Sequence, residues 1–344
     1  MIEEFTHKEI EKIINYKAFK NLKVKNILIT GCGGFIGGYL TSALLSKKNN
    51  KKFNIYGMDI IKPNLNPKIV ATERFFFIKR DLTKVKNFNF KRKMDIVIHL
   101  AGIPSPTYYK KHPLKTYYLN SDLSKIFLEY AKKNNSKFVY FSSSEIYGNP
   151  DSKNIPTKET YDGRVSSISD RSCYDESKRS GETFGYIYKN YFKIDVKIIR
   201  PFNFYGNGTR INDKRIIPQF FFDALSNKKI NVFSNGKQTR TYCNIIDAIP
   251  VIIKICFFGK KFVYNVGNSN NEISAFGIAK IIKKIIGDKS IKIKKIKYPK
   301  DYPSNEPRRR CPDISSIKKE FNYKPKINLA KGLKYFYNYF NKAR

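Results

Sequence analysis

The sequence predicts an α/β protein, in which a Rossmann-type, doubly wound parallel sheet carries a smaller C-terminal lobe that binds the substrate. Three observations lead to this prediction. Short apolar runs alternate with segments of helix length, as they do in successive βαβ units. The first run leads into a glycine-rich turn that opens another helix-length segment. The chain has 344 residues, which is enough for one large α/β unit and a second lobe.

Residues 1–24 are expected to form a helical extension outside the sheet. This stretch is charged throughout, unlike a secretory signal peptide. The most apolar later stretch, 245–258, is interrupted by Asp247, Pro250 and Lys254, so no membrane span is expected. We therefore expect a cytoplasmic protein.

Residues 25–200 are expected to form the Rossmann domain, which contains the glycine-rich turn. Its strands are expected at six apolar runs, namely 26–30, 53–58, 75–78, 95–100, 137–142 and 196–200. After Pro201 the pattern loosens into loops, helices and short strands. Residues 201–344 are therefore expected to form mainly the substrate-binding lobe, with some segments returning to the Rossmann sheet.

The composition is strongly basic, with a formal net charge of +39. A basic chain can bind nucleic acid, and an inactive Rossmann shell with that role is one alternative. The lysines are spread along the whole chain, however, so we favour a solvated basic surface and expect no nucleic-acid partner. Five cysteines without a C-x-x-C pair favour a reduced intracellular protein with no metal site.

The glycine-rich turn is expected to hold the pyrophosphate of a dinucleotide. Gly31, Gly34 and Gly37 are spaced G-x-x-G-x-x-G between the first strand and the following helix. Glycines allow close backbone approach, and the helix N-terminus attracts negative charge. Asp59 closes the second strand, where a carboxylate binds the adenosine ribose and repels a 2′-phosphate. The expected cofactor is therefore NAD rather than NADP.

The reacting groups are expected at the end of the fifth strand and on the helix that follows. The segment "SSSEIYG" (142–148) places protic side chains at the edge of the sheet where ligands bind. Tyr174 and Lys178 are one helical turn apart, so both project from one face of a helix. A nearby ammonium stabilises a phenolate, which makes Tyr174 a candidate general base.

Together these motifs resemble the extended short-chain dehydrogenase/reductases that act on nucleotide sugars. The resemblance rests on "TGCGGFIG", "DL" at Asp81, "HLAG" at His99, "SSSEIYG" and the Tyr174–Lys178 pair, and it covers residues 25 to 335. Within that family the chain is most similar to the UDP-glucuronate decarboxylases, through "RSCYDESKR", "RPFNFYG", "QTRTYC" and "RRRCPDI".

The resemblance implies a role for each reacting group. Ser143 would hydrogen-bond the 4-hydroxyl of the sugar, and Tyr174 would remove its proton as hydride leaves C4. Lys178 would bind the nicotinamide ribose. Further NAD contacts are implied at Phe35, Ile36, Asp81, Leu82, Leu100, Ala101, Gly102 and Asn120.

The pair Ser144–Glu145 bears on the reaction outcome. In many sugar 4,6-dehydratases an aspartate at the first position protonates the leaving 6-hydroxyl, and Ser144 is a poor proton donor. A 4-keto glucuronate needs no such acid, because CO₂ leaves with its electrons delocalised into an enolate. Dehydratases of the GDP-mannose type also carry Ser-Glu, so a 4,6-dehydratase or C4 epimerase of surface polysaccharide biosynthesis stays an alternative.

The family pattern also implies which groups bind the nucleotide sugar. Arg310 is expected near C5, for carboxylate recognition or reprotonation. Guanidinium groups bind diphosphates bidentately. The other implied substrate contacts are Ser105, Tyr109, Asn203, Arg215, Gln238 and Arg240. Helices around 115–133 and 174–190 would form a homodimer interface. The sugar, the nucleotide base and the final reduction by NADH stay open.

Overall fold

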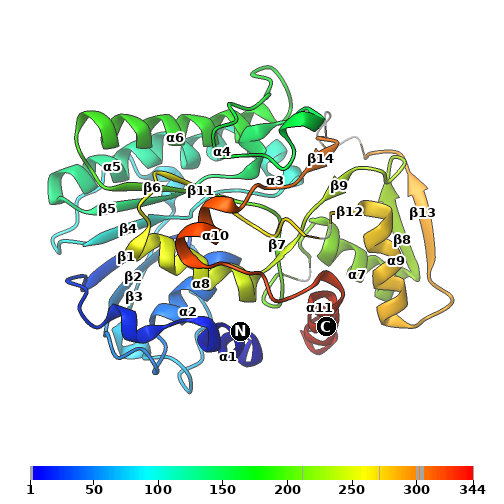
Figure 1. Cartoon of the computed structure of the whole chain (residues 1–344), viewed down its shortest axis with the longest axis horizontal. Coiled ribbons are helices and arrows are strands. Elements are labelled where there is room, and N and C mark those ends of the chain that lie inside the picture. The colour runs from blue at the N-terminus through cyan, green and yellow to red at the C-terminus, as the bar shows by residue number, and fades with distance from the viewer. Residues whose placement is uncertain (1–2, 211, 271, 300–301, 303–305, 344) are drawn as a thin grey trace.

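A seven-stranded parallel sheet forms the centre of the larger part of the molecule (Figure 1). This computed structural model describes residues 3–210, 212–270, 272–299, 302 and 306–343. The strand order is β11–β6–β5–β4–β1–β2–β3, and every neighbouring pair is parallel. The strands are β1 (Asn26–Thr30), β2 (Asn54–Asp59), β3 (Phe75–Lys79), β4 (Ile96–His99), β5 (Lys137–Phe141), β6 (Val196–Pro201) and β11 (Val263–Val266). The expected fold class is confirmed, and β11 comes from beyond residue 200.

The strand order reverses between β1 and β4. From β1 the chain adds β2 and β3 on one side, while β4, β5, β6 and β11 extend the sheet on the other. Thr30 at the end of β1 pairs with Met58 of β2 and with His99 of β4, so these carboxyl ends lie level. Ligands of doubly wound sheets bind outside the carboxyl ends at such a reversal.

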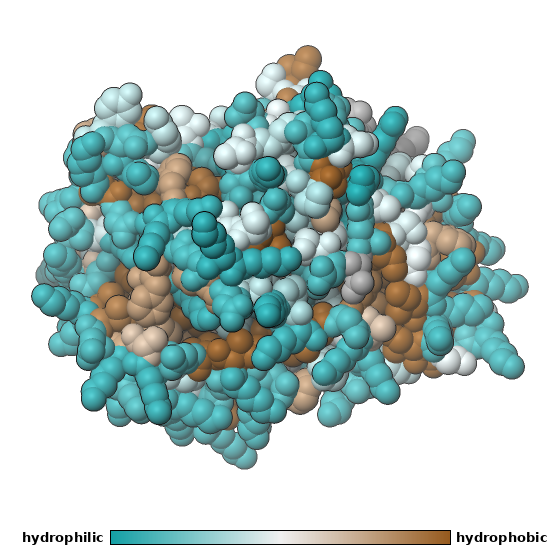
Figure 2. Space-filling model, viewed as in Figure 1, coloured by the Kyte–Doolittle hydropathy of each residue, from teal (hydrophilic) through white to brown (hydrophobic). Residues whose placement is uncertain are grey.

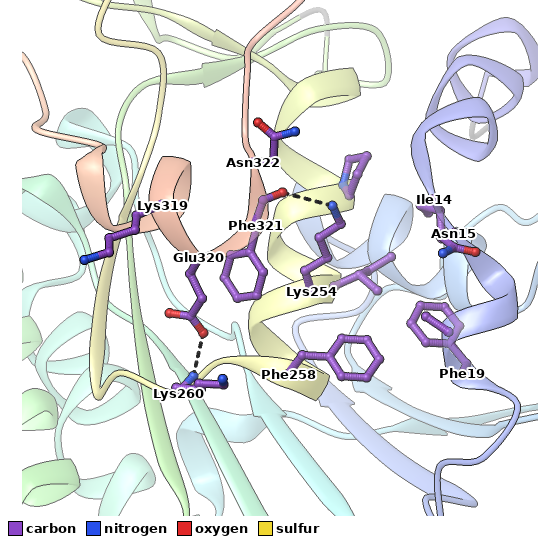
Figure 3. Close-up of a pocket in the computed structure, with 13 residues that line it drawn as sticks. Ile14, Asn15, Phe19, Lys254, Phe258, Lys260, Lys319, Glu320, Phe321 and Asn322 are labelled. Atoms are coloured by element: carbon purple, nitrogen blue, oxygen red, sulfur yellow. Dashed lines mark hydrogen bonds between the residues drawn. The ribbon is translucent and has the colours of Figure 1, made fainter.

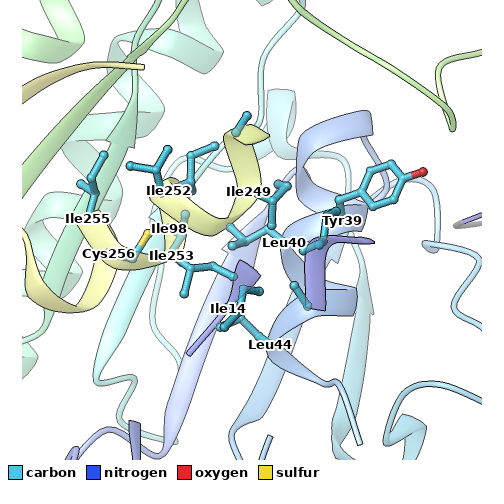
Figure 4. Packing of buried hydrophobic residues seen from close by; sticks show 14 of the residues in the cluster. Ile14, Tyr39, Leu40, Leu44, Ile98, Ile249, Ile252, Ile253, Ile255 and Cys256 are labelled. Carbon is cyan, nitrogen blue, oxygen red and sulfur yellow. The ribbon is translucent and has the colours of Figure 1, made fainter. Parts of the chain in front are cut away.

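Helices cover both faces of the sheet. On one face lie α1 (Glu4–Ile13), α2 (Phe35–Leu44) and α8 (Ile245–Phe258), and on the other α4 (Pro113–Asn120), α5 (Asp122–Asn134) and α6 (Ser172–Tyr191) (Figure 1). Figure 4 shows the first face, where Ile249, Ile252 and Ile253 of α8 pack near Leu40 and Leu44 of α2. Each such fully buried aliphatic side chain contributes about 1.5–3 kcal/mol.

The helix expected around 115–133 is two helices, α4 and α5, which meet at Ser121. The backbone of Ser121 has φ −104° and ψ −81°, outside helical values. The carbonyl of Asn120 accepts a hydrogen bond from the Tyr140 hydroxyl at 2.9 Å and another from the Ser124 hydroxyl at 2.6 Å. These side-chain donors satisfy the carbonyl where the helix is interrupted.

The C-terminal residues also build a smaller lobe with its own core. It contains α7 (Ile216–Asn227), the parallel pair β8 (Lys229–Phe233) and β13 (Lys292–Ile296), α9 (Ala275–Ile286) and α11 (Leu329–Ala343). Two small sheets lie between this lobe and the large sheet (Figure 1), one of β7 (Phe204–Tyr205) with β10 (Cys243–Asn244), the other of β12 (Ile273–Ser274), β9 (Thr239–Arg240) and β14 (Arg309–Arg310).

The N-terminal extension docks through buried polar groups as well as apolar ones. His7 of α1 hydrogen-bonds Ser42 of α2 at 2.8 Å, and its other ring nitrogen lies 3.0 Å from Glu11. The short helix η1 (Tyr16–Phe19) follows and borders a hollow of about 470 Å³ against α8 and α10 (Ser315–Phe321) (Figure 3). There Lys254 donates to the Phe321 carbonyl at 3.3 Å.

The surface is mainly hydrophilic on the face drawn in Figure 2, with small apolar patches between the polar side chains. Among the described helices, none is both long and apolar enough to cross a membrane. Within the same residues, no group of three or more His, Cys, Asp or Glu side chains is placed to hold a metal ion.

Candidate active site

The glycine-rich turn leads from β1 into α2 and leaves no room for side chains. Gly31 has φ +73°, and a Cβ on Gly37 would lie 2.2 Å from the Gly31 carbonyl oxygen. The amide of Gly34 donates to that same oxygen at 3.1 Å. Gly33, which the sequence prediction did not include, is equally constrained, since its Cβ would lie 2.0 Å from the carbonyl oxygen of Ile61. The adjacent glycines at 33 and 34 were the available signal.

Two carboxylates follow neighbouring strands of the sheet. Asp59 at the end of β2 accepts from the backbone amides of Gly33 at 3.0 Å and Ile61 at 3.1 Å. It therefore joins the glycine turn to the loop after β2 and keeps acceptor capacity for a ribose. Asp81 accepts from the amide and the hydroxyl of Thr83, and the hydroxyl bond is the main reason that the pKa of Asp81 lies below its usual value.

A cavity of about 860 Å³ lies at the carboxyl ends of β1, β2, β4 and β5. Most of the residues predicted for the site line it. These are Gly31, Gly34, Phe35, Ile36, Gly37, Asp59, Asp81, Leu82, Leu100, Ala101, Gly102, Ser105, Ser143, Ser144, Glu145, Tyr174, Lys178, Asn203 and Arg215. The predicted residues Tyr109, Asn120, Gln238, Arg240 and Arg310 lie outside this lining.

Tyr174 and Lys178 both lie buried on α6, facing the end of β5. Burial raises the pKa of Tyr174, and a hydrogen bond with the Ser143 side chain opposes that shift. The Lys178 ammonium donates to the Phe141 carbonyl at 2.7 Å and lies 5.8 Å from the centroid of the Tyr174 ring. Burial lowers the pKa of Lys178 to about 7. The geometry brings a hydroxyl, a phenol and an amine together at one wall of the cavity.

Tyr109 has a different place from the substrate contact expected of it. Its ring stacks on that of Tyr174, with centroids 5.2 Å apart and planes at 13°. The side chain is 1% exposed, and its hydroxyl has no hydrogen-bond partner among the described residues. In this structure Tyr109 therefore orients the ring of Tyr174.

Glu145 is held by two arginines. Its carboxylate makes a bidentate pair with Arg310, at 2.6 and 2.7 Å, and a further contact with Arg171. Burial alone would raise the pKa of Glu145, but the charges of Arg171 and Arg310 outweigh it and hold that pKa well below the usual value. Glu145 is therefore ionised at neutral pH.

The other predicted arginines are also paired with carboxylates. Arg240 contacts Glu306 at 2.6 Å, and Arg215 contacts Asp213 at 2.6 Å. Arg171, Asp175 and Glu306 belong to this arrangement, and sequence reasoning missed all three. Arg171, in "RSCYDESKR", lies three residues before Tyr174, and this spacing on one helical face was the only signal for it.

Two amide side chains predicted to bind substrate hold loops in place. Asn203 has φ +44° and donates to the Thr241 carbonyl at 2.9 Å. For Gln238 it is the backbone carbonyl that accepts from the backbone amide of Ala275, at 3.2 Å, at the start of α9. Ser105 precedes α3 (Pro106–Lys111), and its hydroxyl is buried without a partner among the described residues.

The cavity fits a dinucleotide. Asn120 Oδ1 and Ser142 Oγ are buried and, within the described part of the chain, lack hydrogen-bond partners. A Cβ on Gly102 would lie 2.9 Å from Asn120 Oδ1 and 3.7 Å from Lys178 Nζ, so only glycine leaves space there. Glycine-lined walls, a helix N-terminus and a carboxylate after β2 are the parts of an NAD site.

Comparison with known proteins supports this assignment. The sequence model of the NAD dependent epimerase/dehydratase family matches residues 27–267. UDP-glucuronic acid decarboxylase 3 of Arabidopsis thaliana is 34% identical over 310 residues, covering 89% of this chain and 86% of the relative. UDP-glucuronic acid decarboxylase 1 of Xenopus tropicalis is 31% identical over 318 residues, covering 92% of this chain and 72% of the relative.

A solved structure agrees over the same region. UDP-glucuronic acid 4-epimerase from Bacillus cereus, in complex with UDP-glucuronic acid and NAD, has a TM-score of 0.78 at 27% identity and covers 93% of this chain and 100% of that one. dTDP-glucose 4,6-dehydratase from Bacillus anthracis, in complex with NAD, shares the fold, with a TM-score of 0.74 at 22% identity over 92% of this chain and 97% of its own.

Proposed function

Since the chain belongs to the NAD dependent epimerase/dehydratase family, we propose that it decarboxylates UDP-glucuronate to UDP-xylose or to the UDP-4-keto-pentose. One observation carries this proposal. Ser144 replaces a proton-donating acid at the cavity wall, while the neighbouring Glu145 is an ionised carboxylate paired with Arg310 and Arg171. Neither of these two residues of the cavity wall can donate a proton for losing water, and Arg310, behind Glu145, is a cationic group for a sugar carboxylate.

The first step is oxidation at C4. Bound NAD supplies the hydride acceptor for this step. Ser143 holds the 4-hydroxyl by a hydrogen bond, and Tyr174 takes its proton. Lys178, fixed by its bond to the Phe141 carbonyl, stabilises the phenolate form of Tyr174 electrostatically. The product of the step is a 4-keto sugar whose ketone is β to the C6 carboxylate.

Loss of CO₂ follows from that chemistry without an acid. The C5–C6 bond breaks, CO₂ leaves, and the bonding electrons pass into the enolate of the 4-ketone. A proton then adds at C5. Arg310 recognises the carboxylate before it leaves, and Glu145 helps to place the ring. Ser144 is a poor proton donor and an ionised Glu145 cannot protonate a leaving 6-hydroxyl, so the site lacks the acid that many 4,6-dehydratases place there.

A C4 epimerase is the second candidate, and a specific observation favours it. The 4-epimerase of Bacillus cereus was solved with UDP-glucuronic acid bound, so this fold holds the same sugar for a different outcome. A 4,6-dehydratase is the third candidate, favoured by fold alone. The three outcomes differ in mass balance, because an epimerase loses nothing, a dehydratase loses water and a decarboxylase loses CO₂.

We further propose a cytoplasmic homodimer that pairs through α4, α5 and α6. Support comes from large apolar side chains exposed on this layer, with Leu114 85% exposed on α4 and Tyr186 55% exposed on α6. Sedimentation of the purified protein tests this assembly. A mass of one chain over the working concentration range contradicts it.

The test of the reaction is a substrate panel. Purified protein is incubated with NAD and, separately, UDP-glucuronate, UDP-glucose, GDP-mannose and their N-acetyl relatives, and product masses are recorded. From UDP-glucuronate alone, the proposal expects a product lighter by CO₂ when NADH reduces the ketone to give UDP-xylose, or by CO₂ and two hydrogens when the UDP-4-keto-pentose is released. An unchanged mass with an altered retention time from UDP-glucuronate supports the epimerase, and a product lighter by water from another sugar supports the dehydratase.

A further inference from the structure

Behind the wall of the cavity lies a cluster of six ionisable residues, which we call the arginine cluster. It comprises Arg171, Arg240, Arg310, Glu145, Asp175 and Glu306. Glu145 is its only member among the described residues that line the cavity. The three guanidinium groups are at most 7% exposed. Desolvation at such depth makes each charge depend on its partners.

Arg171 is the hub of the arginine cluster. It immediately precedes α6. Its side chain contacts three carboxyl groups, those of Glu145, of Glu306 at 2.9 Å and of Asp175 at 3.6 Å. Neither the cofactor nor the proton transfer at C4 requires it. Its place in the fold is explained by these contacts, because among the described residues it is the one arginine of the cluster in contact with all three carboxyl groups.

Glu145 stands between Arg310 and the cavity. Both of its oxygens are engaged by Arg310, at 2.6 and 2.7 Å. Arg310 is 3% exposed, and its Nε has no hydrogen-bond partner among the described residues. A sugar carboxylate can therefore reach the Arg310 guanidinium only when Glu145 gives up part of this pair. Another contact must then hold the Glu145 carboxylate in place and keep it ionised.

We propose that Arg171 is a positioning residue that determines specificity for an acidic sugar, because it retains Glu145 when the sugar carboxylate takes over Arg310. This inference rests on the proposed function. Glu306 competes with Glu145 for the charge of Arg171. It bridges Arg171 and Arg240, at 2.9 and 2.6 Å, and so draws off part of the positive charge that Arg171 offers to Glu145.

The charge of the arginine cluster supports the exchange. Burial and the charge of Glu145 raise the pKa of Asp175 to about 8, so Asp175 is mainly protonated at neutral pH. Three guanidinium groups then face two carboxylates, Glu145 and Glu306. One positive charge is left over, and one sugar carboxylate would neutralise it. A neutral sugar such as glucose would leave the buried excess charge in place.

The test compares two ligands that differ at C6. Calorimetric titration of the NAD-loaded protein with UDP-glucuronate and with UDP-glucose gives the ratio of their Kd values, in a Tyr174→Phe background that prevents turnover. We expect Arg171→Met to reduce the preference for UDP-glucuronate by about tenfold, which is ~1.4 kcal/mol, with UDP-glucose binding changed less than about twofold. Arg171→Lys should fall between, since an ammonium cannot engage two carboxylates in the same plane.

Glu306→Gln supplies an independent test, in which the preference for UDP-glucuronate should change in the opposite direction. It preserves side-chain volume and removes the competing charge, so the preference for UDP-glucuronate should rise. Arg164→Met is the matched control, because Arg164 pairs with Asp151 on the surface and is 62% exposed in its side chain. The ratio should not change in that variant.

The outcomes separate the inference from its premise. An unchanged ratio in Arg171→Met, or equal weakening of both ligands, overturns the role of Arg171. If Arg171→Met does not fold, Glu306→Gln decides, and an unchanged or lower preference overturns the inference. A Tyr174→Phe parent with no preference for UDP-glucuronate contradicts the proposed function itself and removes the inference with it.

Discussion

At the scale of single residues, burial governs the chemistry of Tyr174 and Lys178. It raises the pKa of the phenol and lowers that of the amine to about 7, because removal from water disfavours the charged form of each. The same low dielectric strengthens the attraction between a phenolate and an ammonium once both have formed. The site therefore favours the ion pair over either charge alone, and each group needs the other.

Loss of the Tyr174 hydroxyl should stop turnover and spare binding. Tyr174→Phe keeps the stacking on Tyr109 and removes the base, so we expect kcat to fall by about 10²–10⁴, with the Kd for UDP-glucuronate nearly unchanged. Steady-state rates and calorimetry measure the two quantities. Tyr186→Phe, on the exposed side of the same helix, is the control. Turnover at the parent rate in Tyr174→Phe would contradict the assignment of the base.

Residue patterns predicted the cavity lining better than the charges behind it. Glycine spacing and the Tyr174–Lys178 pair depend on local geometry, which a sequence carries. The partners of Arg310 and Arg240 are Glu145 and Glu306, and these lie far apart along the chain. Only folding brings such pairs together, so the arginine cluster could not be predicted from spacing. Tyr109 was predicted as a substrate contact, and its stacking on the ring of Tyr174, which is distant along the chain, could likewise not be predicted from spacing.

At the scale of elements, the turn between β1 and α2 is the most constrained part of the site. A Cβ on Gly31 would meet the peptide between Leu100 and Ala101, which follows β4, and a Cβ on Gly34 or Gly37 would approach the Gly31 carbonyl oxygen. Any side chain at the tightest point must push the N-terminus of α2 away from β1. The NAD affinity therefore depends on this one loop.

Gly37→Ala should weaken NAD binding. Its Cβ would lie 2.2 Å from the Gly31 carbonyl oxygen, whereas at Gly34 the same distance is 3.2 Å. We expect Gly37→Ala to raise the Kd for NAD by at least about tenfold, ~1.4 kcal/mol, and Gly34→Ala to have a smaller effect. Titration of the protein with NAD measures both. Equal Kd values for the two variants would contradict the packing argument.

Helix α1 is anchored by buried polar contacts of His7, one of them a hydrogen bond to α2, which predicts a cost for disrupting them. His7→Ala would leave Ser42 and Glu11 without a buried partner that each has now. We expect the free energy of unfolding to fall by about 1–3 kcal/mol, measured by denaturant titration. Lys8→Ala, at an exposed pair with Glu4, should change it little. A loss as large in Lys8→Ala would show that the buried contacts are not the cause.

At the scale of the whole molecule, the apolar runs in the sequence were sufficient to locate most strands of the large sheet. Six apolar runs became six of its seven strands, because a parallel strand buried on both faces must be apolar along its length. The prediction of one helix around 115–133 was wrong, because the chain divides there into α4 and α5. The Tyr140 hydroxyl that bonds the carbonyl at this break comes from β5, which local sequence does not indicate. The short strands β7, β9, β10, β12 and β14 have two residues each and carry no period to detect.

The free energy of unfolding should depend on pH through the ionisation of the buried Asp175. Its pKa is raised in the folded protein to about 8, by burial and by Glu145 and Glu306, against the opposing charges of Arg171 and Arg310. The unfolded state releases this proton more readily, so the contribution of Asp175 to stability is fully present below about pH 4 and is lost as pH rises to 8. Each pH unit in that window costs up to about 1.4 kcal/mol.

Asp175→Asn removes this ionisation. Its free energy of unfolding, measured by denaturant titration, should therefore decline less than that of the parent between pH 6 and 8. Asp151→Asn, at the exposed pair with Arg164, is the control. Parallel pH profiles for Asp175→Asn and the parent would contradict a raised pKa at this position.

The central claim is that the carbon lost from the substrate is C6 of a glucuronate. The most direct measurement uses UDP-glucuronate labelled with ¹³C at C6, incubated with the NAD-loaded protein, and follows the label by NMR. The account predicts that the label leaves as ¹³CO₂ and bicarbonate and that the pentose product carries none. A label that stays on the sugar, whether in an epimer or in unchanged substrate, would contradict it.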